Sequence, residues 1–433
     1  MKRLAPDYVY TPQGLMSGQV VNISDQGFIL SITDRESGEE VTEVLPGMVL
    51  LPGFVNTHSH AFQRALRGHT HRRLSANDTF WTWRHAMYTA VQRLTPDLIY
   101  EQTLQVYREM LAAGYTSVGE FHYVHHKPDG QPYENSNILS EMVVQAGRDA
   151  GIRVVLLLTA YAQGNFHQPP DTYQRRFCDR SLDAYLTRAE ALRVTGIPFG
   201  VAPHSVRAVP ADWLRAIANY SRQYHLPFHI HADEQQAEIE QCLAAEGCTP
   251  IELLQRSEAL SHLTTVVHAT HANAQEIELL ARAGSTVCVC PTTEGDLGDG
   301  IAPYNELRQA NIPLAIGSDS NTRLDPFEEL RWAEYSARMR YQRRRVLVPD
   351  ELDSPGSLLF SYGTKIGAQA LGLQSGQIAS GQAADFIAID LNTPALAGWT
   401  SEDVLDTLFF GVSSSQVIKQ TWVQGQKVWS AWC

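Results

Sequence analysis

The sequence predicts an α/β protein: a (β/α)8 TIM barrel with a small β-sandwich domain formed by the N- and C-terminal segments. In the middle of the chain, eight short strand-like runs alternate with amphipathic helical stretches, which is the pattern of parallel strands joined by crossover helices. The two ends instead contain short alternating β segments. We therefore expect the barrel over residues 53–372 and the small domain over residues 1–52 and 373–433.

Eight apolar runs are the candidates for the barrel strands. They are Val49–His58, Thr116–Tyr123, Arg153–Tyr161, Pro198–His204, Leu226–His231, Thr264–His268, Ser285–Cys290 and Ile312–Gly317. Helical periodicity falls between them, for example over Asp97–Ala113, Ala211–Tyr224, Ala274–Ala283 and Pro326–Arg340. Gly114 and Gly284 follow two of these helices, as is typical of a helix stop. Eight such units over about 320 residues match a TIM barrel with enlarged loops.

The composition narrows the class of protein. The formal net charge is −13, from 47 acidic and 34 basic side chains, which argues against a nucleic-acid-binding protein because such proteins normally carry a basic face. Six scattered cysteines, Cys433 among them, do not form a disulfide framework and favour a reducing compartment. We find no signal peptide and no membrane span, so we expect a cytoplasmic protein.

Metal-competent side chains stand at the carboxyl ends of the predicted strands. The first strand leads into His58-Ser59-His60, and alternate residues of a strand point to the same side. Later strands end at His204, His231 and His268, and the last runs into Asp319. Since active sites of TIM barrels lie at this end of the strands, we expect these side chains to meet there.

Three of these histidines and one carboxylate form a ligand set for a catalytic metal. His58, His60, His231 and Asp319 would give N₃O coordination and leave a position for water. Water on zinc reaches a pKa near ~7, which makes hydroxide available at neutral pH. We expect one Zn²⁺ per chain, while Fe²⁺ or Mn²⁺ would suit the same ligands.

Two further residues are placed to act on a substrate. Glu234 lies three residues after His231 and would carry a proton from the metal-bound water to a leaving group, a role that typically contributes ~10²–10⁴-fold. His268 would hydrogen-bond the tetrahedral centre, and His271 is the alternative if its strand ends later.

The remaining histidines are expected to lie outside the site. We expect His122, His125 and His126 in an exposed loop, and His69 and His71, beside Arg72-Arg73, in a solvated connection.

Several motifs resemble the metal-dependent amidohydrolase superfamily. They are Pro52–His60, His231 with Glu234, and Gly317–Ser320. Within that superfamily, nearly the whole chain is similar to the formimidoylglutamate deiminases. The segments that carry this resemblance are His58–Ala65, Thr79–Arg84, Gly119–Tyr123, Pro203–Arg207, Pro291–Gly300 and Glu328–Trp332.

The resemblance implies a reaction and a set of residues. The reaction is the zinc-dependent hydrolysis of N-formimino-L-glutamate to N-formyl-L-glutamate and ammonia, a step of histidine degradation, by attack of metal-bound hydroxide on the amidine carbon. The resemblance makes Glu234 the proton shuttle and His268 the partner of the tetrahedral intermediate. It also assigns substrate binding to Gln63, Arg84, Tyr123, His204 and Arg207. The two arginines suit a dicarboxylate amidine, and a homodimer is implied.

Some alternatives remain at this point. An aminohydrolase of a heterocycle such as guanine or a triazine would use the same metal site with an uncharged aromatic pocket, and a scaffold barrel would not be catalytic. Glu294 stands where related deaminases carry Asn; it would pair with a cationic amidine or with an arginine, or it would cap a helix. The stretch Asn321–Arg323 matches no family pattern.

Overall fold

Eight parallel strands form the predicted barrel in the computed structural model, which describes residues 1–36, 40–72 and 78–431. Hydrogen-bonded neighbours follow the order β13-β12-β11-β10-β9-β8-β7-β6, and an isolated parallel bridge between Ser59 and Asp319 joins β6 to the loop after β13. The strands are β6 (Phe54–Ser59), β7 (Tyr115–His122), β8 (Arg153–Ala160), β9 (Phe199–Pro203), β10 (Phe228–Ala232), β11 (Thr264–His268), β12 (Thr286–Val289) and β13 (Leu314–Ile316).

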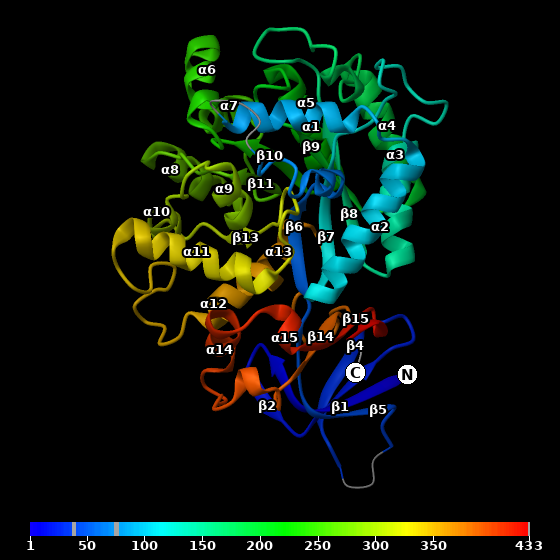
Figure 1. Ribbon diagram of the computed structural model, residues 1–433, viewed down its shortest axis with the longest axis vertical. Coiled ribbons are helices and arrows are strands. Elements are labelled where there is room, and N and C mark those ends of the chain that lie inside the picture. The colour runs from blue at the N-terminus through cyan, green and yellow to red at the C-terminus, as the bar shows by residue number, and fades with distance from the viewer. Residues whose placement is uncertain (37–39, 73–77, 432–433) are drawn as a thin grey trace.

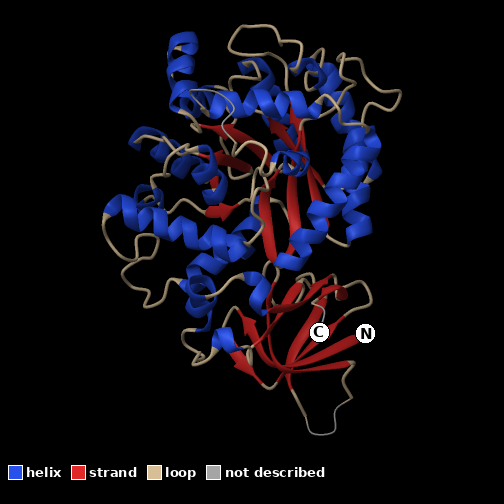
Figure 2. Ribbon diagram, in the orientation of Figure 1, coloured by secondary structure: helices blue, strands red, loops and turns tan. Residues whose placement is uncertain are grey.

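Helices surround these strands (Figures 1 and 2). They are α1 (Phe80–Val91), α2 (Pro96–Ala113), α3 (Ile138–Ala150), α4 (Leu182–Thr195), α5 (Ala211–Tyr224), α6 (Gln236–Glu246), α7 (Pro250–Arg256), α8 (Ala274–Ala283), α9 (Pro291–Leu297), α10 (Tyr304–Gln309), α11 (Pro326–Tyr341), α12 (Gly356–Ser361) and α13 (Gly367–Ala370). The four helices named in the sequence analysis correspond to α2, α5, α8 and α11, and each of their ends agrees with the prediction to within one residue. Gly114 ends α2 at a φ of 97°, a left-handed conformation that favours glycine. Short helical turns are η1 (Ala61–Leu66), η2 (Gln174–Arg176) and the π-helix η3 (Tyr362–Ile366).

The prediction of one strand over Val49–His58 is wrong. The structure divides this run into β5 (Glu43–Pro52), which belongs to a second sheet, and β6, which begins at Phe54. A Cβ on Gly53 would lie 2.1 Å from a side-chain atom of Thr116, so the chain passes between the sheets where a side chain has no room. Both strands are buried at this point, and the apolar pattern therefore continues across the break.

The two ends of the chain build the second sheet, as predicted. Its strands are β1 (Lys2–Thr11), β2 (Gly14–Ser17), β3 (Gln19–Ile23), β4 (Ile29–Asp34), β5, β14 (Phe386–Asp390), β15 (Ile418–Val423) and β16 (Gln426–Ser430). Strand β14 pairs antiparallel with β5, while β1 pairs parallel with β5. Leu50, Phe386 and Trp422 share a hydrophobic core that is separate from that of the barrel. Helices α14 (Val404–Gly411) and α15 (Ser414–Val417) and the turn η4 (Pro394–Leu396) precede β15.

Two observations bear on the class of protein. The described helices include none that is long and apolar enough to cross a membrane. The five cysteines among the described residues are free thiols, while Cys433 and Arg73 lie outside the described residues.

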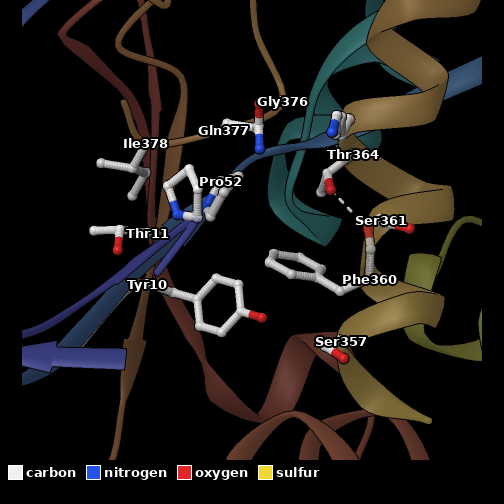
Figure 3. A pocket seen from close by; sticks show the side chains of 12 residues that line it. Tyr10, Thr11, Pro52, Ser357, Phe360, Ser361, Thr364, Gly376, Gln377 and Ile378 are labelled. Carbon is white, nitrogen blue, oxygen red and sulfur yellow. Dashed lines mark hydrogen bonds between the residues drawn. The ribbon is translucent and has the colours of Figure 1, made fainter. Parts of the chain in front are cut away.

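A hollow of about 510 Å³ lies where the second sheet meets the barrel helices. Tyr10 of β1, Pro52 of β5 and Phe360 of α12 line it (Figure 3). None of the residues predicted for the functional site is among its lining residues. The candidate site lies instead at the carboxyl ends of the barrel strands.

Candidate active site

Four predicted metal ligands converge at the carboxyl ends of the strands. The His58 Nε2 atom lies 3.1 Å from His60 Nε2 and 3.1 Å from His231 Nε2. The Asp319 Oδ1 atom lies 3.2 Å from His60 Nε2 and 3.5 Å from His58 Nε2. All four side chains are buried, and their ligand atoms lie within 4.8 Å of one another. His58 lies on β6 and His60 directly after it, while β10 supplies His231 and the loop after β13 supplies Asp319.

This arrangement fits a divalent cation. Ligands about 2.0–2.1 Å from a metal lie roughly 3–3.5 Å apart when they are neighbours around it, and the four distances given above, 3.1–3.5 Å, match this spacing. Backbone oxygens hold the other ring nitrogens of two of these histidines: His60 Nδ1 donates to Phe121 O at 2.7 Å and His231 Nδ1 to His204 O at 2.9 Å. These bonds leave the Nε2 lone pairs for a metal. Burial lowers the pKa of His58 to about 3, which keeps that imidazole neutral as a ligand must be.

One cavity of about 440 Å³ joins this cluster to the other predicted residues. It is lined by His60, Gln63, Arg84, Tyr123, His204, Arg207, His231, Glu234, His268 and Asp319, together with Phe80, Trp83, Met87, Tyr88 and Leu297. Every residue predicted for the site except His58 therefore lines the same cavity, and His58 lies against His60 and His231.

Glu234 and His268 lie beside the ligand cluster. The His268 Nε2 atom is 3.8 Å from Glu234 Oε1 and 3.7 Å from Asp319 Oδ2. Burial alone would lower the pKa of His268, but the charges of Glu234 and Asp319 and a hydrogen bond to Glu294 hold that pKa well above its usual range. Burial raises the pKa of Glu234. The alternative residue, His271, donates to Asp299 O at 2.9 Å and does not line the cavity.

Three residues in or beside this cluster have a left-handed backbone conformation. His268, Asp319 and Asn321 have φ values of 76°, 47° and 58°. Non-glycine residues in this region cost on the order of 1–3 kcal/mol each and persist where the surrounding structure fixes them. Such strain is typical of functional sites, since it holds a side chain in one position.

Two arginines form a second part of the cavity lining. Arg207 is 5% exposed, and its Nε and Nη1 atoms have no hydrogen-bond partner among the described residues. The Arg84 Nε atom donates to Tyr88 Oη at 2.5 Å. Both guanidinium groups lie over the Trp81 ring, at 5.3 Å for Arg84 and 6.0 Å for Arg207. Because unpaired buried donors are costly, this side of the cavity is suited to an anionic ligand.

Gln63 offers the cavity an acceptor. Its Nε2 atom donates to Tyr123 Oη at 2.9 Å, and its Oε1 atom is buried with no partner among the described residues. His204 lies between Tyr123 and His231, with ring centroids 5.1 Å and 5.0 Å away.

The sequence analysis missed a polar network behind Arg84. Tyr88 Oη lies 3.3 Å from Tyr161 Oη, and Gln174 Nε2 donates to Tyr161 Oη at 3.1 Å. Tyr88 lies one helical turn after Arg84 on α1, so that spacing could have identified it. Nothing in the local sequence marks Gln174, which lies in the turn η2.

Glu294 is 3% exposed and lies behind His268 without lining the cavity. Its Oε1 atom accepts from the backbone N–H of Cys290 at 2.8 Å, at the start of α9, and lies 3.3 Å from His268 Nδ1. These contacts agree with the helix-capping alternative and add a contact with His268.

The expectation of an exposed loop at His122, His125 and His126 is wrong, because all three side chains are buried. The turn η2 covers them: the backbone N–H groups of His125 and His126 donate to Arg176 O, and His125 Nε2 donates to Thr159 O at 2.7 Å. Burial lowers the pKa of His122 to about 3 and that of His126 to about 4. A long loop that folds back over a strand end left no periodic signal in the sequence. His69 and His71 are exposed, as expected.

Comparison with known proteins agrees with this geometry. Residues 49–428 match the model of the amidohydrolase family. The chain belongs to this family. It is 38% identical over 422 residues to the formimidoylglutamate deiminase of Pseudomonas aeruginosa, which covers 96% of this chain and 92% of that relative. It is 27% identical to a 5-methylthioadenosine/S-adenosylhomocysteine deaminase of Haloquadratum walsbyi, over 93% of this chain and 84% of that protein.

Solved structures show the same fold. An amidohydrolase from Brucella melitensis superposes with a TM-score of 0.91 at 33% identity, over 99% of this chain and 94% of that one. An adenosine deaminase from Xanthomonas campestris, with bound zinc, superposes with a TM-score of 0.81 at 23% identity, over 98% and 92% of the two chains; this second likeness concerns the fold alone. This amidohydrolase is therefore a hydrolase that acts on C–N bonds, which argues against the scaffold alternative.

Proposed function

We propose that this amidohydrolase hydrolyses N-formimino-L-glutamate to N-formyl-L-glutamate and ammonia, with one zinc ion per chain. The observation that carries this proposal is the pairing, in one cavity, of a metal-competent cluster with two arginines, one of which has unpartnered donors. A substrate with two carboxylates and an amidine complements both sides of that cavity. The 38% identity to a formimidoylglutamate deiminase supports the same substrate.

The metal would be held by His58, His60, His231 and Asp319. When bound, a divalent cation supplies a water of lowered pKa and polarises the group under attack. An N₃O ligand set suits Zn²⁺, and the same ligands would accept Fe²⁺ or Mn²⁺.

The protein's own residues would then move the protons. Water adds across the C=N bond: its oxygen joins the amidine carbon, and Glu234 accepts one proton. Glu234 delivers that proton to the terminal nitrogen and then carries the remaining hydroxyl proton to the same nitrogen. The C=O bond forms as the C–N bond to this nitrogen breaks, and ammonia leaves. The His268 Nε2–H group donates to the oxygen on the tetrahedral carbon.

The remaining residues would bind and orient the substrate. Arg84 and Arg207 bind the carboxylates, and the Gln63 Oε1 atom, which lacks a partner, accepts an amidine N–H. Tyr123 and His204 enclose the amidine beside the metal ligands.

A second candidate is an aminohydrolase of a heterocyclic ring. The aromatic residues Phe80, Trp83 and Tyr88 in the cavity lining favour it, as does the 27% identity to a deaminase of methylthioadenosine. A neutral ring would leave the donors of Arg207 unpaired, and we therefore rank this candidate second.

Ammonia release tests the proposal directly. We expect the purified, zinc-loaded protein to release ammonia from N-formimino-L-glutamate and not from guanine or 5′-methylthioadenosine. A chelator should abolish this activity, and added Zn²⁺ should restore it. Release from guanine without release from N-formimino-L-glutamate would favour the second candidate. We also propose a homodimer in the cytoplasm, which light scattering and cell fractionation check.

A further inference from the structure

The first and last strands of the barrel, β6 and β13, are joined by less β pairing than the other neighbouring strands. Strands β6 and β13 are the two ends of the ladder order, and one isolated bridge, Ser59 to Asp319, is the β pairing described between them. Three backbone hydrogen bonds add to it: Ser318 N and Asp319 N donate to His58 O, and His60 N donates to Asp319 O. We call this junction the seam. His58 and His60 lie on one side of the seam and Asp319 on the other, so the seam sets the distance between metal ligands.

A chain of buried side chains crosses the seam. Its members are Asn56 and Ser59 of β6, Glu120 of β7, and Ser318 and Asn321 of the loop after β13, all at most 1% exposed. We call these five residues the seam network. Asn56 Nδ2 donates to Ser318 Oγ at 2.6 Å, and Ser318 Oγ donates to Asn321 Oδ1 at 2.5 Å. Asn321 Nδ2 donates to Ser59 Oγ at 3.1 Å, and Ser59 Oγ donates to Glu120 Oε2 at 2.8 Å.

Each link of the seam network adjoins a metal ligand. Ser59 lies between His58 and His60, and Ser318 directly precedes Asp319. Glu120 accepts from Ser59 Oγ and also from the backbone N–H of Ala61, at 2.6 Å, and so holds the chain on both sides of His60.

Asn321 joins the two halves of the seam network. Its Oδ1 atom receives a hydrogen bond from Ser318 on the Asp319 side, and its Nδ2 atom gives one to Ser59 on the histidine side. Its φ of 58° lies in the left-handed region that Asn tolerates better than most residues. Arg64 of η1 donates to Asn321 O at 2.5 Å and so anchors the loop as well. A fully bonded polar network of this kind makes a buried site rigid.

We propose that Asn321 is a positioning residue of the metal centre, which holds His58 and His60 against Asp319 across the seam through Ser59 and Ser318. The inference depends on the metal site of the proposed function but not on its substrate. Loss of residues that support ligands typically lowers metal affinity 10–100-fold, and we expect that range here.

The zinc dissociation constant of metal-stripped protein, measured against a chromophoric chelator, tests this role without any substrate. Asn321→Gly keeps the left-handed backbone accessible while it removes both side-chain bonds, and Ser59→Ala removes the adjoining link. Asn137→Ala is the matched control, because Asn137 is also buried but donates to Arg188 O, outside the seam network. Circular dichroism confirms that each variant is folded.

We expect zinc affinity to fall about 10–100-fold in Asn321→Gly and Ser59→Ala and to stay within twofold of wild type in Asn137→Ala. Wild-type affinity in a folded Asn321→Gly or Ser59→Ala protein would overturn the inference, and an equal loss in Asn137→Ala would assign the effect to general stability. Wild-type protein that binds zinc tightly but releases no ammonia from N-formimino-L-glutamate would refute the proposed substrate alone. Wild-type protein that binds no zinc would refute both proposals.

Discussion

The two sides of the cavity differ in how completely their polar groups are paired. On the strand-end side, formed by His58, His60, His231 and Asp319, backbone oxygens bind the Nδ1 atoms of His60 and His231, and His58 Nδ1 is the one ring nitrogen without a partner among the described residues. On the arginine side, formed by Arg84 and Arg207 over the Trp81 ring, two nitrogens of Arg207 have no partner among the described residues. The first side is thus organised for a small cation before substrate arrives, whereas the second has free donors that suit an anionic ligand.

The difference follows from where each side is placed in the fold. The ligands of the strand-end side stand on barrel strands or directly after one, where backbone pairing fixes their positions. Arg84 and Trp81 belong to α1, which Figure 1 shows above the barrel strands in that view, and Arg207 lies in the loop after β9. Loops and covering helices can adjust to a substrate more readily than strands. We therefore expect changes on the strand-end side to affect turnover and those on the arginine side to affect binding.

The largest expected effect is on the strand-end side. Glu234→Gln should lower kcat by ~10²–10⁴-fold, because it removes the group that carries the proton. Zinc content and KM should stay near wild type, since Glu234 is not a metal ligand in the proposal. Steady-state ammonia release and metal analysis of the same preparation measure both quantities.

Glu246→Gln is a control for this prediction, since Glu246 lies at the end of α6, the helix that follows Glu234, outside the cavity. Turnover in Glu234→Gln equal to that of the control would remove Glu234 from the mechanism.

The strand-end side could be predicted from residues alone. His58 and His60 share one face of a strand by simple alternation, and His231 and Asp319 follow from the rule that active sites lie at the ends of barrel strands. The arginine side came from resemblance to a family, because one arginine among many carries no positional signal. Asn321 and Gln174 were missed because their partners are distant: Asn321 bonds Ser59, 262 residues away, and no local pattern encodes such a pair.

The fold was also predicted from patterns of residues. That prediction failed where hydrophobic periodicity carries no information. Alternation of strands and helices gave the barrel, and the helix boundaries agreed closely. The break at Gly53 was missed because β5 and β6 are both buried, so hydrophobicity does not change between them. Likewise, the burial of His122, His125 and His126 depends on Arg176, about 50 residues later in the chain.

A smaller effect is expected on the arginine side. Arg207→Met should raise KM about 10–100-fold with little change in kcat, because a hydrogen bond to a charged group contributes ~1.5–3 kcal/mol and each 1.4 kcal/mol is about tenfold in affinity. Methionine keeps an apolar chain of similar length in place. Initial rates over a range of N-formimino-L-glutamate concentrations separate the two constants.

The control for Arg207 is Arg193→Met, which removes an ion pair with Glu190 on α4. If Arg207→Met lowered kcat and left KM unchanged, the arginine side would act in turnover. The expected division, in which the strand-end side affects turnover and the arginine side affects binding, would then be wrong.

The smallest effect concerns a buried carboxyl group that supports the strand-end side. Glu329 of α11 is fully buried and accepts from Thr292 N at 3.0 Å and from Thr292 Oγ1 at 2.5 Å, which fixes the start of α9. Burial raises the pKa of Glu329 to about 8, against about 4.3 in an unfolded chain. The folded state thus keeps a proton that the unfolded state has lost, and the free energy of unfolding should fall as pH rises from about 4.5 to about 8 and then level off.

Glu329→Gln should remove this part of the pH dependence, since an amide of the same shape keeps a contact with Thr292 and does not titrate. We subtract the free energy of unfolding of the variant from that of the wild type. Within that window, this difference should fall by about 1 kcal/mol for each pH unit of increase, so the wild type is favoured at low pH. Urea unfolding at pH 5, 6, 7 and 8 measures this difference, and parallel curves for the two proteins would show that Glu329 is ionised in the folded state. The kcat of Glu329→Gln at pH 7 should stay within a few-fold of wild type, because Glu329 supports α9 without lining the cavity. A large loss of kcat would show that the strand-end side is held in place by helix α11 as well as by the barrel strands.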